Sequence, residues 1–306
     1  QRRAVLLRDE FRDVHGQFRQ PRGPFRVVRV AAQQAPVVPN RGRAAAGGQQ
    51  HGLRARLDQG AFRVPLLVLY TEQAEVVADD PDKLISDRDE TNLHLTDALG
   101  PYFLNLAQEL TIFSPYFVPG EEGVEYFSSL VNQGVRVRIL TNSLASTDVP
   151  VVHSGYAKYR QDLLRAGVAL YEMKPRPSKT GQRGGSRFSG SSKASLHSKA
   201  FIFDRKHIFI GSLNLDPRSI HENTEIGVVL TSPQLAGRIT SVIDEALDRI
   251  AYRLALETHS DGREQIEWHE PITGDGGRTY SVDPHTTFWN RFLIGFVGLL
   301  PVESQL

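Results

Sequence analysis

Residues 196–214 read LHSKAFIFDRKHIFIGSLN, and the two apolar runs within them predict a pair of strands. The runs AFIF and HIFI flank a polar turn that begins at Asp204. His197 and Lys199 precede the first run by a few residues. Because they are two residues apart, their side chains point to the same face if they belong to the strand. The stretch therefore predicts a strand pair that presents an imidazole and an ammonium group together.

The polar residues of this stretch suit phosphoryl chemistry. A phosphate ester needs positive charge, neutral hydrogen-bond donors and a nucleophile. His197 could act as nucleophile or acid, and Lys199 could hold the phosphate. Ser212 and Asn214 could donate to phosphoryl oxygens, while Gly211 permits close backbone approach. A strand pair with exposed His and Lys is the alternative, but the full pattern His-x-Lys-x4-Asp-x6-Gly-Ser-x-Asn favours a functional site.

Two carboxylates accompany this pattern. Glu225 begins the apolar run EIGVVL, and it could hold the imidazole in one tautomer. Asp204 either supports the fold or tunes the site directly. These residues complete the candidate site that the chain shows without reference to any other protein.

Strand and helix patterns alternate from about residue 86 onward. This alternation predicts an α/β fold, a mixed β-sheet flanked by helices. Further predicted strands cover 109–118, 135–142, 168–173 and 225–230, and predicted helices cover 120–133, 153–166 and 233–256.

The composition divides the chain near residue 83. Residues 1–82 contain thirteen Arg but no Lys, Ile or Ser. We expect residues 1–85 to be disordered, and three interpretations remain open: a flexible arm, a polyanion-binding arm, or a segment read out of frame. The sequence does not begin with Met, so we expect a fragment, a processed product or an incomplete reading frame.

The totals exclude several classes of function. The chain has 306 residues and no Cys, which excludes disulfides, thiol catalysis and Cys-ligated zinc. The net charge of +1 gives no global field that would attract nucleic acid.

After residues 1–85, two further domains are expected: a catalytic domain at 86–280 and a C-terminal segment at 281–306. This last segment contains the apolar run FWNRFLIGFVGLL, which is too short to span a bilayer. It either packs as a terminal helix or lies in a membrane interface, and we favour the interface.

Several segments resemble a known family. The pattern around His197 is similar to the HKD motif of the phospholipase D superfamily, and GSLNLDPRSIHENTEIG (211–227) resembles bacterial cardiolipin synthases, most closely those of the C type. The resemblance extends over about residues 90–306. Its other segments are TIFSPYFVP (111–119), VRILTNSLASTDVPVVHSGYAKYRQDLLRAGVALYEMKP (137–175) and TTFWNRFLIGFVGLLPVE (286–303).

The resemblance implies a phosphatidyltransferase that uses no metal or other cofactor. In that family two similar halves each supply one HKD motif. One histidine forms a phosphohistidine, and the second, which His197 matches, acts as acid and base. The implied partners are phosphatidylglycerol, phosphatidylethanolamine and a membrane surface, with peripheral association at the bacterial inner membrane. His153 could then contact a lipid headgroup instead of facing the core. Arg218 could bind phosphate instead of pairing with Asp216 or Glu222.

The chain departs from the family pattern at one decisive point. No other His has a Lys two places on, so the first motif is not found. Either two copies of the chain supply His197 twice, or a first half has been lost. The alternatives are a homodimeric single-motif phosphodiesterase or nuclease, a lipid hydrolase, and an inactive half that only binds membrane. Nucleic acid is a disfavoured substrate because the net charge is near zero.

Overall fold

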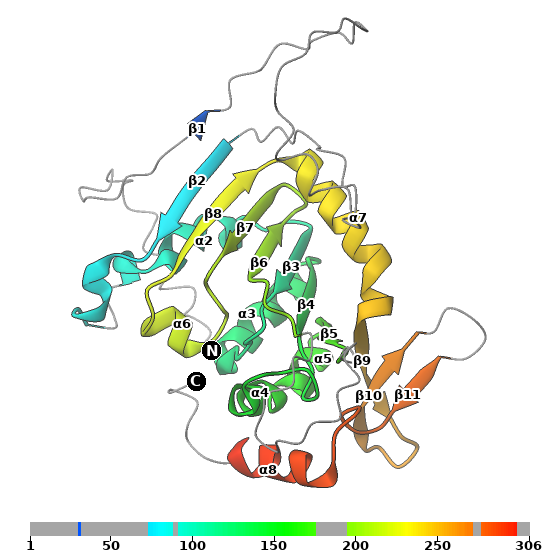
Figure 1. The fold of residues 1–306 in the computed structure, drawn as a ribbon. Coiled ribbons are helices and arrows are strands. Elements are labelled where there is room, and N and C mark those ends of the chain that lie inside the picture. The colour runs from blue at the N-terminus through cyan, green and yellow to red at the C-terminus, as the bar shows by residue number, and fades with distance from the viewer. Residues whose placement is uncertain (1–29, 32–72, 88–90, 176–194, 272–276, 299–306) are drawn as a thin grey trace, which may run out of the picture.

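One mixed β-sheet organises the residues that the structure describes, which in this computed structural model are 30–31, 73–87, 91–175, 195–271 and 277–298. Its strands lie in the order β1-β2-β8-β7-β6-β3-β4-β5-β9-β10-β11 (Figure 1). The strands are β1 (Val30–Ala31), β2 (Gln73–Ala78), β3 (Glu109–Phe113), β4 (Arg136–Asn142), β5 (Ala169–Met173), β6 (Ala200–Phe203), β7 (His207–Gly211), β8 (Ile226–Thr231), β9 (Ala251–Thr258), β10 (Glu264–Glu270) and β11 (Arg278–Tyr280). The helices are α2 (Leu95–Leu104), α3 (Gly120–Asn132), α4 (Pro150–Ala157), α5 (Arg160–Arg165), α6 (Pro217–His221), α7 (Pro233–Ile250) and α8 (Phe288–Gly298), with short 3-10 helices η3 (Pro81–Leu84) and η4 (Thr91–Leu93).

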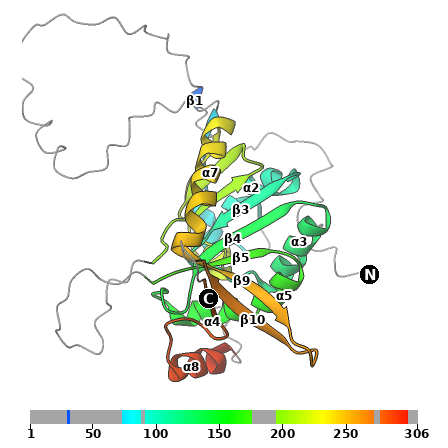
Figure 2. The same ribbon diagram turned by 90° about the vertical axis from the view of Figure 1, so that its right-hand side faces the viewer.

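Parallel pairing lies at the centre of the sheet. Strands β3, β4 and β5 run parallel, while β6, β7, β8 and β2 follow on one side in antiparallel pairs. Helices cover both faces, with α7 on one and α2, α3 and α5 on the other (Figure 2). Phe201 and Phe209 belong to the larger core beneath α2 and α3. Ile202 and Ile208 point the other way and pack against Ala236 of α7. The predicted mixed sheet flanked by helices is confirmed.

Helix α3 forms as its apolar spacing predicts. Phe127 and Leu130 are buried on its inner face, and Val124 packs against the same core. The helix ends before Gly134, which has φ +87°, a conformation that favours glycine. The predicted helix over 120–133 is therefore correct within one residue.

The predicted helix over 153–166 is two helices, α4 and α5. The break occurs where the Tyr159 amide donates to the Tyr156 carbonyl at 2.9 Å, three residues back. This tighter bond replaces the four-residue spacing of an α-helix. Pro150, in the first turn, also starts α4 earlier than predicted.

The predicted helix over 233–256 ends at Ile250, and the chain continues as β9. Tyr252 and Leu254 are buried on alternate positions of this strand. They pack in the core because β9 pairs with β5 and β10. The apolar period changes from 3.6 to 2 at Ala251, and the prediction missed this change.

Two other boundaries differ from the predictions. Strand β3 ends at Phe113 instead of residue 118, because Pro115 cannot donate to a strand partner. Strand β2 pairs with β8 over six residues, so residues 73–78 belong to the sheet. The predicted boundary at residue 86 therefore lies beyond a strand of the domain. The predictions for residues 1–29 and 32–72 lie outside the described residues.

Helix α8 packs against α4 at the lower end of the molecule in Figure 1. Ile294 is its buried residue, at 8% exposure. Among the helices of the described residues, none combines the length and the apolar content that crossing a membrane requires.

Candidate active site

The chain segments that carry the candidate residues meet at one edge of the sheet. The first residue of β6, Ala200, is paired with Phe113 at the end of β3 and with Ile210 near the end of β7. Gly211 at the end of β7 is in turn paired with Gly227 near the start of β8. The residues that precede β6 and β8 and those that follow β3, β4 and β7 are therefore neighbours.

His197 and Lys199 lie just outside β6. Neither residue belongs to the strand, because β6 begins at Ala200, so the condition under which both side chains would share one face of the strand is not met. The Gly211 amide still donates to the Lys199 carbonyl at 3.2 Å, which extends the pairing by one residue. His197 is exposed, and the Lys199 Nζ donates to its carbonyl at 3.3 Å. This hydrogen bond keeps the Lys199 ammonium group close to the backbone of His197.

The Lys199 ammonium group is influenced by the charges of three carboxylates. Burial lowers the pKa of Lys199, and the negative charges of Glu225, Asp148 and Asp216 oppose this shift. The sequence prediction included Glu225 but missed the roles of Asp148 and Asp216. Lys199 therefore lies in a partly desolvated position, and the carboxylate charges near it favour its charged form.

Gly211 and Ser212 join the end of β7 to the start of β8. A Cβ atom at Gly211 would lie 2.5 Å from the Ile226 carbonyl oxygen, so only glycine fits here. The Ser212 hydroxyl donates to the Ile226 carbonyl at 3.3 Å and accepts from the Ile226 amide at 3.0 Å. The predicted role of Ser212 as a phosphoryl donor is not supported, because these bonds commit its hydroxyl to the backbone.

Asn214 is buried beside α6. Its Nδ2 donates to the Ser219 hydroxyl at 3.3 Å. Its Oδ1 is enclosed and has no hydrogen-bond partner in the described residues. An enclosed amide oxygen is an acceptor and cannot bind a phosphoryl oxygen, so only the NH2 group of Asn214 could donate to one.

Glu225 is buried and is held by β2 and the turn before it. Its amide donates to Asp79 Oδ2 at 2.7 Å, and its Oε1 accepts from Asn223 at 3.3 Å. Asp79 also forms a buried ion pair with Lys83 at 2.8 Å. Residues from the segment predicted to be disordered therefore support the predicted site carboxylate.

Asp204 lies at the other end of β6 from His197. Its carboxylate accepts hydrogen bonds from the amides of Ala107, Gln108 and Glu109 at 3.0, 2.8 and 2.9 Å. Asp204 itself has φ +50°, so these bonds also hold a turn in the left-handed region. Of the two roles that the sequence left open for Asp204, these hydrogen bonds match support of the fold, and they place its carboxylate at the end of β6 away from His197.

His153 is in the core, at 4% exposure, so the proposed headgroup contact is contradicted. Its Nε2 accepts from Arg160 at 2.6 Å, and Arg160 pairs with Glu172 at 2.9 Å and Asp283 at 2.8 Å. Burial raises the pKa of Asp283, but the nearby Arg160 charge outweighs this and holds the pKa well below its usual range. This network joins α4, α5 and β5 to the segment before α8.

Arg218 is exposed on α6. The carboxylate of Asp216 instead accepts from the Ser219 amide at 2.8 Å and so caps α6. Burial raises the pKa of Asp216, and the bonds from Ser219 oppose the shift. The predicted pairing of Arg218 with Asp216 is therefore replaced by helix capping.

Tyr116 and Asp148 were missed by the sequence prediction. The Tyr116 hydroxyl donates to Asp148 at 3.1 Å. Burial and the Asp148 charge raise the pKa of Tyr116 to about 12, so its hydroxyl stays protonated at neutral pH. Both residues follow the carboxyl ends of the parallel strands β3 and β4. That position was the available signal, because ligands commonly bind at such ends of open α/β sheets.

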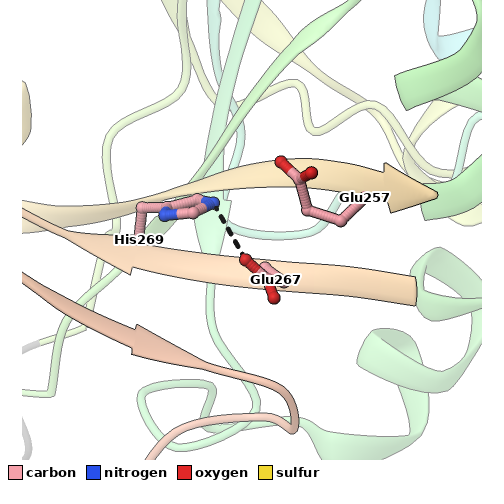
Figure 3. Close-up of side chains that lie close together, drawn as sticks. All are labelled: Glu257, Glu267 and His269. Carbon is pink, nitrogen blue, oxygen red and sulfur yellow. Dashed lines mark ion pairs between the residues drawn. The ribbon is translucent and has the colours of Figure 1, made fainter. Parts of the chain in front are cut away.

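A second cluster of ionisable side chains lies on the β9–β10 pair. Figure 3 shows Glu257, Glu267 and His269, whose ligand atoms lie within 4.8 Å of one another. His269 Nε2 pairs with Glu267 at 3.5 Å, and Arg253 is directly opposite His269 in the strand register. The ion pair accounts for the arrangement, and the neighbouring cation would oppose a bound metal ion. The cluster thus does not by itself indicate a metal site.

Comparison with known proteins shows that the segment containing His197 is similar to a known family. Residues 103–247 match the family described as "Cardiolipin synthase, PLD-like domain". Cardiolipin synthase C of Escherichia coli (strain K12) is 38% identical over 243 residues, which cover 78% of this chain and 50% of that protein. Cardiolipin synthase A of Pseudomonas aeruginosa (strain LESB58) is 31% identical over 142 residues, covering 46% of this chain and 25% of that protein.

A solved structure also resembles the chain. It is a phospholipase D family member, Nuc from Salmonella typhimurium, with a TM-score of 0.40 and 15% identity, covering 60% of this chain and 99% of that chain. The chain spans 50% of the length of cardiolipin synthase C and 25% of the length of cardiolipin synthase A. The segment with the family match includes β3 to β8 and both His197 and Lys199. Over this segment the chain matches the family of cardiolipin synthase PLD-like domains.

Proposed function

We propose that this chain transfers a phosphatidyl group from a phospholipid to phosphatidylglycerol and so forms cardiolipin. The observation that carries the proposal is the placement of His197, Lys199, Asn214 and Glu225 at one sheet edge, on segments far apart in sequence. The relatives named cardiolipin synthase support the choice of reaction. The donor would be phosphatidylglycerol or phosphatidylethanolamine.

The reaction would proceed in two displacements at phosphorus. A histidine nitrogen attacks the donor phosphate, a phosphorus–nitrogen bond forms, and the bond to the leaving alcohol breaks. A second histidine, the role proposed for His197, gives its proton to the leaving oxygen. His197 then takes the proton from a hydroxyl of phosphatidylglycerol, whose oxygen displaces the phosphohistidine nitrogen. Lys199 and the NH2 group of Asn214 would stabilise the charge on the phosphoryl oxygens.

Each reaction needs two histidines, and the chain carries one His-x-Lys pattern. We infer that a second copy of the chain supplies the nucleophilic His197. In a symmetric dimer the same edge of each copy would face the other, which is the self-complementary arrangement of a two-fold interface. A separate polypeptide with its own motif is the alternative source.

The first experiment is a product assay on lipid vesicles. The parent chain, His197→Ala and the control His259→Ala would be incubated with phosphatidylglycerol, with and without phosphatidylethanolamine, and the lipids read by mass spectrometry. His259 is exposed on the β9–β10 turn and bonds to Gln265, so its loss should leave turnover unchanged. We expect His197→Ala to lower cardiolipin formation at least about a hundredfold, because it removes proton transfer.

The products separate the alternatives. Phosphatidic acid without cardiolipin would indicate hydrolysis instead of transfer. A folded parent chain that makes neither lipid, or a His197→Ala variant that matches the parent, would contradict the proposal.

We also propose that α8 docks on the membrane surface and that the protein is peripheral to the bacterial inner membrane. Five large apolar side chains of α8 are exposed. They are Phe288 (63%), Trp289 (72%), Phe292 (57%), Leu293 (58%) and Phe296 (55%). Aromatic and aliphatic side chains on one helix, with a polar backbone satisfied internally, suit the bilayer interface. Because α8 packs on α4, which follows the site residue Asp148, docking would bring lipid near Lys199.

A further inference from the structure

Asn142, the last residue of β4, uses its side chain to hold the backbone next to His197. The residue is 1% exposed. Its Oδ1 accepts from the Leu196 amide at 2.8 Å, and its Nδ2 donates to the Leu196 carbonyl at 3.2 Å. One amide side chain thus bonds both backbone groups of one residue, as a neighbouring strand would.

The remaining capacity of this amide joins two other segments of the site. Ser146 donates to Oδ1 at 3.2 Å, and Nδ2 also reaches the Pro115 carbonyl at 3.4 Å. Two acceptor positions and two donor hydrogens are all used. Reversing the amide would place its NH2 group against the Leu196 amide and its oxygen against two carbonyls, so its orientation is fixed.

The segment that Asn142 holds has few other constraints. Residues 195–199 precede β6 and form no strand. The Leu196 side chain is buried near Leu140 and Leu247, which fixes this position on one side. His197, the next residue, is exposed. The imidazole therefore depends on how firmly the Leu196 backbone is held.

We propose that Asn142 is a positioning residue, which sets the place of the His197 imidazole through the Leu196 backbone and ties it to the Tyr116 turn through Pro115. This inference rests on the proposed function, because it concerns the same reaction. It adds a residue to which the pattern around His197 gives no clue. A group displaced by about 1 Å from its productive geometry can lower a rate about a hundredfold.

The test compares Asn142→Asp with a matched control. Aspartate has the same shape and keeps the acceptor for Leu196, but it cannot donate to the Leu196 and Pro115 carbonyls. Asn142→Ser serves as a second variant if the first does not fold. Leu130→Ala is the control, because Leu130 is buried in α3 near the opposite end of β4. Cardiolipin formation on vesicles would give kcat and KM, and hydrogen exchange would give the protection of the Leu196 amide.

We expect kcat per folded chain to fall at least about tenfold in either Asn142 variant, with KM for lipid within about twofold of the parent. The Leu196 amide should also exchange at least about tenfold faster in Asn142→Ser, because its acceptor is gone. Leu130→Ala should change neither quantity per folded chain. A kcat equal to that of the control, or unchanged exchange at Leu196, would overturn the proposal. A parent chain without turnover would count against the proposed function, and exchange at Leu196 would then decide whether Asn142 holds this segment.

Discussion

At the scale of single residues, neighbours in the sequence do different work in the structure. His197 and Lys199 lie at the sheet edge of the candidate site, whereas Asp204 binds the backbone before β3. All three belong to one sequence pattern, so the pattern combines candidate site residues with a residue that supports the fold. Ser212 shows the same division, because its hydroxyl is bound to the Ile226 backbone.

Glu109 is another residue whose charge supports the fold. Its carboxylate bonds to Arg136 and Arg138 of β4 and to Arg205 at 3.1 Å. Burial alone would raise the pKa of Glu109, but the bond from Arg136 and the nearby positive charges lower it from 4.5 to about 2. The charged form therefore stabilises the folded state.

This lowered pKa predicts how stability depends on pH. The contribution is complete above the ordinary pKa of 4.5 and is lost as the pH falls toward 2. We expect Glu109→Gln to lower the free energy of unfolding at pH 7 by about 2–3 kcal/mol, and by much less near pH 2. Urea unfolding at both pH values measures this. Glu257→Gln, at an exposed position on β9, is the control, and an equal loss for Glu109→Gln at both pH values would contradict the assignment.

At the scale of elements, α7 and β9 show where local patterns change meaning. The chain passes directly from Ile250 in the helix to Ala251 in the strand. Ala251 is paired with Met173 of β5, so tertiary pairing decides where the helix stops. In helix α8, by contrast, most of the large apolar side chains are exposed and do not pack in the core.

The exposed face of α8 predicts a test of membrane docking. We expect Phe288→Ser, Trp289→Ser and Phe292→Ser together to weaken binding to phosphatidylglycerol vesicles at least about tenfold, because burial of these rings in the interface is lost. Vesicle co-sedimentation measures the bound fraction, and circular dichroism checks the helix content. Val242→Ser on α7 is the control, since Val242 is 59% exposed on a different element. Unchanged binding of the triple variant would exclude α8 as the docking surface.

At the scale of the whole molecule, the sheet gathers the site from distant segments. Its strand order places β2 beside β8, and β6 between β7 and β3. Asp79, which lies 146 residues before Glu225, holds the backbone of this site carboxylate. A single chain therefore supplies one His-x-Lys pattern at this sheet edge, whereas the proposed reaction needs two such patterns.

Mixing of chains tests whether two copies complete one site. If each active unit needs His197 from both copies, an equal mixture of parent and His197→Ala chains that exchange freely should retain about a quarter of the activity of the same total amount of parent. Independent chains would retain about half. The assay is cardiolipin formation after subunit exchange, and exchange between differently tagged parent chains is the control. A value of one half with complete exchange would contradict the dimeric site.

The sequence by itself determined the α/β class and the elements with clear periodicity, such as α3, and it predicted the chemistry proposed around His197. These features depend on residue types and offsets within one short segment, where side-chain period directly reflects backbone geometry. Only the tertiary structure decided that Asp204 is a support, that His153 is in the core, that β9 is a strand and that Asn142 binds Leu196. The physical reason is that such contacts join distant segments: 54 residues separate Asn142 from Leu196, and 97 separate Ala107 from Asp204. They depend on strand order and register, which no local pattern contains.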